Sequence, residues 1–320
     1  MGGMGLVKAQ IAIGFAVLVL LVAGTALVPV VSPQDDEGSN GGIEIVGPYG
    51  VQSVSEIALG TALTGYPEQA MVYRTVDTTV SKDDALKMAE KLGMTGSLEE
   101  NVLSYYIKGD PYTFDIEKEG GCLSYTWKGR WNSVDSRDRP ENLPADEEAR
   151  KIAETFLKEH DLMPEGAVYS GVAHGEGFFS NRTDGTSIQT HKDTQVSFTG
   201  TLNGLPVFGN WMYVTIGGDG DILKVFKRWR DAEPYKEFAI LSPEEAIEEL
   251  KQTGVVATVS SPKRAVVTEI KIGYYASPPR DEQPYLKPTY YFRGTVEGEN
   301  ETGTFFQYIP AVLELGKGLY

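Results

Sequence analysis

The sequence predicts an α+β protein: an N-terminal transmembrane helix followed by repeated modules, each with a short helix packed on an antiparallel sheet. Three observations lead to this prediction. The chain opens with a long uncharged apolar run. Three short amphipathic segments with acidic first turns recur along it. Alternating, β-rich segments separated by glycine turns follow each of them.

The apolar run covers residues 11–31 and contains no charged residue. About 20 apolar residues span the hydrocarbon core of a bilayer, so this run is long enough for a transmembrane anchor. Lys8 precedes it and Asp35, Asp36 and Glu37 follow it. The positive-inside rule therefore predicts a single-pass membrane protein whose N-terminus is cytoplasmic and whose residues 33–320 lie outside the cytoplasm.

Two other interpretations of this terminus stay open. A cleavable signal peptide would use Gly24, Thr25 and Ala26 as a small-residue cleavage site. A pilin-like leader would use Lys8, Ala9 and Gln10 ahead of the hydrophobic helix. We expect the uncleaved anchor, because residues 27–31 keep the run apolar beyond the cleavage site.

The first and second helices are predicted at residues 81–93 and 146–160. Ser81 can cap the first, and Gly93 suits the left-handed position that ends it. The second helix carries apolar residues at helical spacing, and Pro164 follows its end.

The third helix is predicted at residues 242–254, where the local signals are strongest. Ser242 and Glu245 form a capping-box pattern, Pro243 occupies the first helical position, and Gly254 ends the segment. All three helices are short, so each must pack on a sheet to be stable.

The strands are predicted from residue alternation and turn signals. Asn203-Gly204 marks a hairpin, and the Gly-rich turn at 217–221 links the next two strands. Ten strands are expected, at 104–107, 112–116, 123–127, 167–172, 194–202, 207–216, 221–230, 266–275, 289–296 and 304–312.

The predicted domain organisation has five parts. A polar, flexible spacer follows the anchor, and residues 43–70 carry no assignable pattern. The expected boundaries are 1–31 for the cytoplasmic stub and anchor, 32–70 for the spacer and weakly patterned segment, and 71–140, 141–235 and 236–320 for three modules.

Composition excludes several classes of function. The formal net charge of −16 argues against nucleic acid as a partner. One Cys among 320 residues excludes an intrachain disulfide framework and a cysteine-based zinc site. We therefore expect no catalytic residues, no metal and no cofactor, and a protein that is not an enzyme.

The few chemically suggestive clusters have simple structural interpretations. His174, Glu176 and His191 fall in a segment expected to be a surface loop, without a third fixed metal ligand. His160 at a helix C-terminus complements the helix dipole. Cys122 has no neighbouring pattern of a nucleophile and is expected to be an inert thiol.

The segment 197–209, with its Asn-Gly-Leu-Pro-Val-Phe-Gly hairpin, and the strand, Gly/Asp turn and strand of 214–222 resemble PepSY-type and thermolysin-propeptide-type modules. Segments 81–127 and 242–313 are similar more loosely. The stretch 270–312 also resembles exported regulators of the YycH/YycI type. The resemblance implies PepSY-like modules that inhibit peptidases or regulate extracytoplasmic activities, and that carry no catalytic set.

The expected function is therefore that of a membrane-anchored binding or regulatory protein that recognises a peptide or an envelope protein at a sheet surface or edge. Two alternatives are an extracytoplasmic hydrolase with a dispersed site and a pilin-like structural subunit. The sequence does not indicate the oligomeric state. The candidate partner-binding residues are basic or aromatic: Lys224, Lys227, Arg228, Trp229, Arg230, Tyr274, Tyr285 and Tyr291. Asn181 and Asn300 begin acceptor triplets for glycosylation.

Overall fold

The computed structural model describes residues 50–129, 142–180 and 187–312. Strands hold 50% and helices 16% of the structure, and the described residues contain three α-helices. The fold is therefore mostly sheet, and the predicted fold class, an α+β protein that begins with a transmembrane helix and continues in PepSY-like modules, is wrong. The strands are more numerous than the sequence patterns predicted, and those at 167–180 and 187–202 are much longer.

Within the described ranges no helix is both long enough and apolar enough to cross a bilayer. The apolar run at 11–31, with its anchor, signal-peptide and pilin-like interpretations, lies outside the described residues. The transmembrane helix is accordingly not part of the fold described below.

The three α-helices lie where the local signals predicted them. They are α1 (Lys82–Lys91), α2 (Asp146–Glu159) and α3 (Pro243–Thr253). The Ser81 side chain accepts a hydrogen bond from the Asp84 backbone N–H. Ser242 and Glu245 form the complete capping box at α3. No side chain caps α2.

Seventeen strands are present in the described residues, most of them antiparallel. They are β1 (Val51–Gln52), β2 (Glu56–Leu59), β3 (Gln69–Thr75), β4 (Glu99–Glu100), β5 (Ser104–Lys108), β6 (Tyr112–Glu117), β7 (Leu123–Trp127), β8 (Ala167–Ser180), β9 (Ser187–Leu202), β10 (Leu205–Ile216), β11 (Ile222–Arg228), β12 (Ala232–Ala239), β13 (Val255–Ala257), β14 (Arg264–Tyr275), β15 (Tyr285–Leu286), β16 (Pro288–Glu297) and β17 (Thr302–Pro310).

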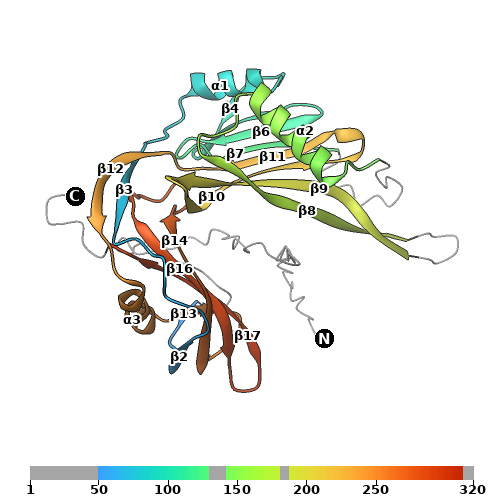
Figure 1. The fold of residues 1–320 in the computed structure, drawn as a ribbon. Coiled ribbons are helices and arrows are strands. Elements are labelled where there is room, and N and C mark those ends of the chain that lie inside the picture. The colour runs from blue at the N-terminus through green and yellow to red at the C-terminus, as the bar shows by residue number, and fades with distance from the viewer. Residues whose placement is uncertain (1–49, 130–141, 181–186, 313–320) are drawn as a thin grey trace, which may run out of the picture.

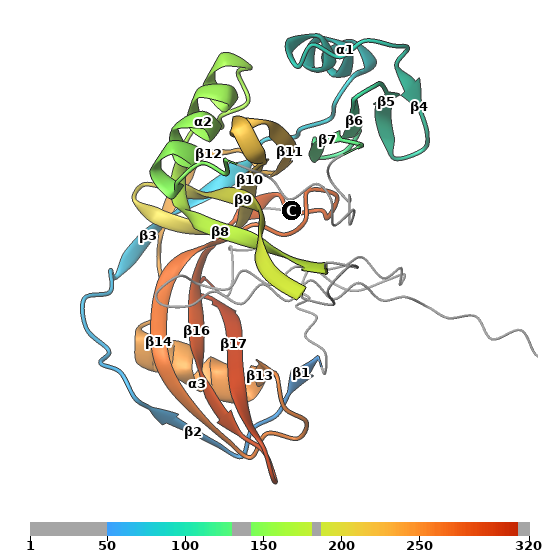
Figure 2. The same ribbon diagram turned by 90° about the vertical axis from the view of Figure 1, so that its right-hand side faces the viewer.

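Fourteen of these strands form one sheet, which bends into two halves (Figure 1). The first half contains β4 to β11, and the second contains β1, β2, β13, β14, β16 and β17. Strands β12, β3 and β15 form a separate small sheet. The helices lie on the outer side of the bend, α1 and α2 on the first half and α3 on the second (Figures 1 and 2).

Each half has its own hydrophobic core beneath its helices. Helices α1 and α2 share one core, in which Ala89, Phe114 and Leu157 are buried. Helix α3 covers a second core with Leu250 and Phe292. The segments predicted as the first two modules thus bury their apolar residues together, while the module boundaries themselves stay a prediction.

The two halves of the large sheet meet where β10 pairs with β14. This pairing is parallel and involves Val207 with Tyr274 and Phe208 with Tyr275. The Ala276 N–H also donates to the Phe208 carbonyl oxygen at 2.7 Å. Parallel strands must come from chain segments far apart in sequence, so this joint depends on tertiary structure.

Two glycines allow the backbones to approach at this joint. A Cβ atom on Gly209 would lie 2.0 Å from the Ala276 carbonyl oxygen, and one on Gly273 would lie 2.4 Å from the Pro206 carbonyl oxygen. Gly209 also has a positive φ of 98°. Any other residue at position 209 would therefore both strain the backbone and push β10 away from β14.

We predict that Gly209→Ala destabilises the protein more than a Gly→Ala substitution that strains the backbone without causing a steric clash. Gly204 is the matched control, because its φ is 77° but nothing lies within 4 Å of its Cβ position. Gly204→Ala should cost about 1–2 kcal/mol, and Gly209→Ala at least about 2 kcal/mol more. Urea unfolding followed by tryptophan fluorescence measures both, and equal losses would show that the joint is loose.

Candidate functional site

The basic run at the end of β11 is divided between the two sides of the sheet. Successive side chains of a strand point to opposite faces. Val225 and Trp229 are buried in the core beneath α1 and α2, so Lys227 lies on that side. Burial lowers the pKa of Lys227. Lys224 and Arg228 lie on the opposite side, away from the helices.

The predicted tyrosines are likewise in different environments. Tyr274 is 1% exposed, donates its hydroxyl hydrogen to the Met71 carbonyl oxygen at 2.9 Å and packs edge-on against Tyr73. Tyr285 lies in the small sheet, with its ring centroid 5.3 Å from that of Tyr235. Tyr291 lies on the same side of the large sheet as Lys224 and Arg228.

We call that side of the large sheet, opposite α1, α2 and α3, the open face. It lines the inner side of the bend (Figure 1). It carries eight aromatic rings in two clusters: the first cluster is Trp211, Tyr213 and Phe226, and the second is Phe208, Tyr275, Tyr291, Phe306 and Tyr308.

The first cluster lies on the paired strands β10 and β11. Trp211 and Tyr213 have ring centroids 4.8 Å apart, and Phe226 lies 5.6 Å and 5.3 Å from them. The Lys224 ammonium lies 5.5 Å from the Tyr213 ring centroid and 5.8 Å from that of Phe226. Burial lowers the pKa of Lys224, so this ammonium is partly removed from water.

The second cluster exists because β10 meets β14. Phe208 of β10 lies 5.2 Å from Tyr291 and 5.3 Å from Tyr308, measured between ring centroids. Tyr275 and Phe306 contact Tyr308 at 4.9 Å and 6.1 Å. Strands β10, β14, β16 and β17 therefore contribute rings to one surface.

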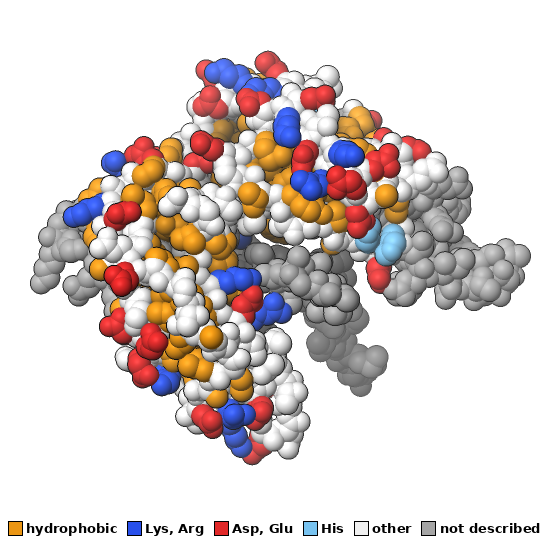
Figure 3. Space-filling view, viewed as in Figure 1, with side chains coloured by type: hydrophobic (Ala, Val, Ile, Leu, Met, Phe, Trp, Pro, Cys, Tyr) orange, Lys and Arg blue, Asp and Glu red, His pale blue; other side chains and the backbone are white. Residues whose placement is uncertain are grey.

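Arginines lie among these rings. Arg228 donates from Nε to the Gly209 carbonyl oxygen at 3.3 Å, which places it between the two clusters. Burial raises the pKa of Tyr275, and the charge of Arg228 opposes that rise. Burial raises the pKa of Tyr291 to about 12, and Arg293 opposes it. Figure 3 shows Lys and Arg side chains along the inner edge of the second half.

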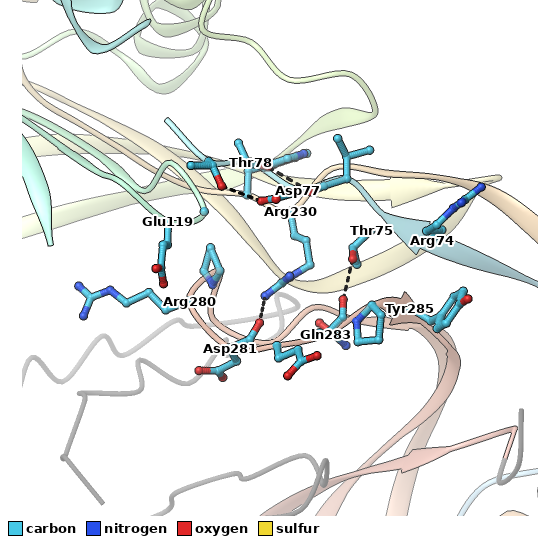
Figure 4. Close-up of a pocket in the computed structure, with 17 residues that line it drawn as sticks. Arg74, Thr75, Asp77, Thr78, Glu119, Arg230, Arg280, Asp281, Gln283 and Tyr285 are labelled. Atoms are coloured by element: carbon cyan, nitrogen blue, oxygen red, sulfur yellow. Dashed lines mark hydrogen bonds between the residues drawn. The ribbon is translucent and has the colours of Figure 1, made fainter. Parts of the chain in front are cut away.

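A cavity of about 490 Å³ lies beside the joint between the two halves. It is bounded by the end of β3, the turn between β6 and β7, the end of β11 and the loop 277–284. The charged residues that line it are of both signs: Arg74, Asp77, Glu119, Arg230, Arg280, Asp281 and Glu282 (Figure 4).

Arg230 crosses this cavity and fastens the loop to the sheet (Figure 4). Its Nη2 donates to the carbonyl oxygens of Pro278 and Asp281 at 2.8 Å and 2.9 Å. Its backbone N–H donates to the side-chain oxygen of Asn210, and its carbonyl oxygen accepts a hydrogen bond from the side-chain amide nitrogen of the same residue. The Nε atom is buried without a hydrogen-bond partner. These contacts assign Arg230 a structural role at the joint.

The structure brings His174 and His191 together on the β8–β9 hairpin, which was expected to be a loop. Their ring centroids are 4.5 Å apart, and His174 Nε2 lies 3.1 Å from Asp146 Oδ1 at the start of α2. Strand pairing sets Glu176 opposite His191. Even so, no three His, Cys, Asp or Glu side chains of the described residues are placed to hold a metal ion.

Of the two glycosylation triplets, one lies in the described part of the chain. Asn300 is exposed in the turn between β16 and β17. Asn181 lies outside the described residues.

Of the eight rings, the sequence predicted only Tyr291 as a partner-binding residue. Alternation along β10 and β11 is a signal that could have found the first cluster, because Tyr213 pairs with Phe226 across the predicted Gly-rich turn. No local signal indicates the second cluster, which depends on the β10–β14 pairing.

No protein-family model matches the sequence, and neither does any curated protein. Among solved structures, the chain is similar to a crystal structure of an uncharacterized protein from Eubacterium rectale ATCC 33656. The two are 14% identical, with a TM-score of 0.45, over 79% of this chain and 86% of that one. A likeness this weak carries no argument, and the resemblance to PepSY-type, propeptide and YycH/YycI proteins finds no support in the comparisons.

The burial of the single thiol of the chain can be tested by alkylation. Cys122 lies beside β7, where burial raises the pKa of its thiol to about 12. Because thiolate is the reactive form, we predict that iodoacetamide alkylates the native protein at pH 8 at least about a hundredfold more slowly than the urea-unfolded chain.

The same raised pKa gives the sign of a stability effect. The unfolded thiol ionises near pH 8.5, while the folded thiol keeps its proton. Stability from Cys122 is thus fully present below about pH 8.5 and is lost as the pH rises towards the folded pKa. The free energy of unfolding should fall more steeply above that pH than in Cys122→Ser. Equal alkylation rates in native and unfolded chains would contradict the burial of this thiol.

Proposed function

We propose that the protein acts by binding rather than by catalysis, and that it holds a peptide segment of a partner protein on the open face. The observation that supports this best is the pair of aromatic clusters on the side of the sheet away from its helices. Such rings supply a large contact area with few rotatable bonds, which is why aromatic residues are enriched where proteins bind one another.

The burial of the rings fits this proposal. Phe208, Trp211, Phe226, Tyr275 and Phe306 are half-buried, so part of each ring remains accessible. Tyr213, Tyr291 and Tyr308 are buried between their neighbours and hold the half-buried rings in place. A rigid set of accessible rings loses little entropy when a ligand packs against it.

The proposal predicts that Trp211 is needed for peptide binding. Short random peptides would be selected on the immobilised full-length protein, and their dissociation constants measured by fluorescence anisotropy. We expect Trp211→Ala to weaken binding at least about tenfold, which is about 1.4 kcal/mol. Phe226→Leu, which keeps an apolar side chain of similar length, should weaken it less.

Trp127→Ala is the matched control, since Trp127 contacts Tyr112 on the helix-covered side of β6 and β7. The urea midpoint of Trp127→Ala measures how much stability is lost when a tryptophan outside the open face is removed. Lost stability can then be distinguished from lost peptide binding. If the selected peptides bind Trp211→Ala as tightly as the wild type, the open face is not the binding site.

A further inference from the structure

The open face carries positive charge among its rings, although the chain as a whole has a formal net charge of −16. Lys224, Arg228, Lys271 and Arg293 lie on this face. Lys271 is paired with Glu269 at 2.6 Å. Arg228 and Arg293 form no ion pair with a carboxylate of the described residues, although Glu269 lies opposite Arg293 on the paired strands β14 and β16.

The environment of these cations strengthens their attraction for an anion. Lys224 is partly desolvated beside Tyr213 and Phe226, and Arg228 is bonded to the Gly209 carbonyl oxygen at the joint. A charge near a low-dielectric surface interacts more strongly with a carboxylate than one surrounded by water. Hydrogen bonds between a guanidinium and a carboxylate are also among the strongest in proteins.

The arrangement of the clusters fits a ligand in extended conformation. The rings lie on five neighbouring strands, in the order β11, β10, β14, β16 and β17. The four steps between these strands, each of about 4.8 Å, span about 19 Å. An extended chain advances about 3.3 Å per residue. About six residues in extended conformation therefore span the two clusters, past Arg228.

We infer that the ligand of the open face is an acidic, extended segment of a partner protein. Its carboxylates face Lys224 and Arg228, and its apolar side chains pack on the two aromatic clusters. This inference rests on the proposed function and adds the chemical class of the ligand to it. The charge of Arg228 between two sets of rings favours alternating acidic and apolar residues over a neutral ligand.

Three fluorescein-labelled peptides test the inference on the full-length protein: one alternating Glu and Phe, one with Gln in place of Glu, and one with Lys in place of Glu. We expect the Glu peptide to bind at least about tenfold more tightly than the Gln peptide, and the Lys peptide to bind most weakly. The advantage of the Glu peptide should shrink as salt is raised, because salt screens partly exposed charges.

The variants locate the effect. Lys224→Gln with Arg228→Gln should lower the affinity of the Glu peptide by a larger factor than that of the Gln peptide, and so remove most of the preference for Glu over Gln. Lys224→Gln alone keeps the hydrogen bond from Arg228 to Gly209 and should remove part of the preference for the Glu peptide. This single variant therefore separates the effect of lost charge from the effect of a loosened joint. Lys236→Gln on β12 is the matched control: Lys236 is exposed and also lies over an aromatic ring, 5.5 Å from the Phe238 centroid.

The outcomes separate this inference from the proposed function. If the Glu and Gln peptides bind equally and both weaken in Trp211→Ala, peptide binding stands and the acidic ligand is overturned. Tightest binding of the Lys peptide also overturns it. If none of the three peptides binds and selection yields no Trp211-dependent peptide, both the inference and the proposed function fail.

Discussion

The close approach of β10 to β14 is the constraint on which the rest of the structure depends. Gly209 and Gly273 make it sterically feasible, since a Cβ atom at either would collide with a carbonyl oxygen of the other strand. Two residue pairs and the bond from Ala276 N–H to the Phe208 carbonyl then join the halves of the sheet. Phe208 reaches Tyr291 and Tyr308 only because of this joint, and Arg230 fastens the neighbouring loop to the same place.

Local structure could be predicted where local chemistry determines it. The cap at Ser81, the capping box at Ser242 and the hairpin at Asn203-Gly204 are confirmed, because each depends on residues within a few positions of one another. The fold class could not be predicted in the same way. Much of the strand content that the sequence did not predict lies in β8 and β9, whose Gly-rich and His-containing segments resemble a loop. The rest includes β1 to β3, which show no clear alternation.

The candidate site was predicted only in part, for a physical reason. Residues 224–230 are contiguous in sequence, but the two-residue period of a strand separates Lys224 and Arg228 from Lys227 and Trp229. Tyr274 is a core residue beside Tyr73, although its neighbour Tyr275 lies on the open face. A patch of residues that are close in sequence is therefore a poor guide to a surface, whereas rings from β10, β11, β14, β16 and β17 form one surface through long-range pairing.

The two halves of the sheet present one continuous aromatic surface, because Phe208 of the first half packs against Tyr291 and Tyr308 of the second. Nuclear Overhauser effects between the ring protons of Phe208 and those of Tyr308, in protein labelled selectively at Phe and Tyr, test it most directly. The structure predicts such effects from Phe208 to both Tyr291 and Tyr308, whose centroids lie 5.2 Å and 5.3 Å away. Effects between Tyr291 and Tyr308 without any to Phe208 would contradict it, because the second half would then be folded but not joined to β10.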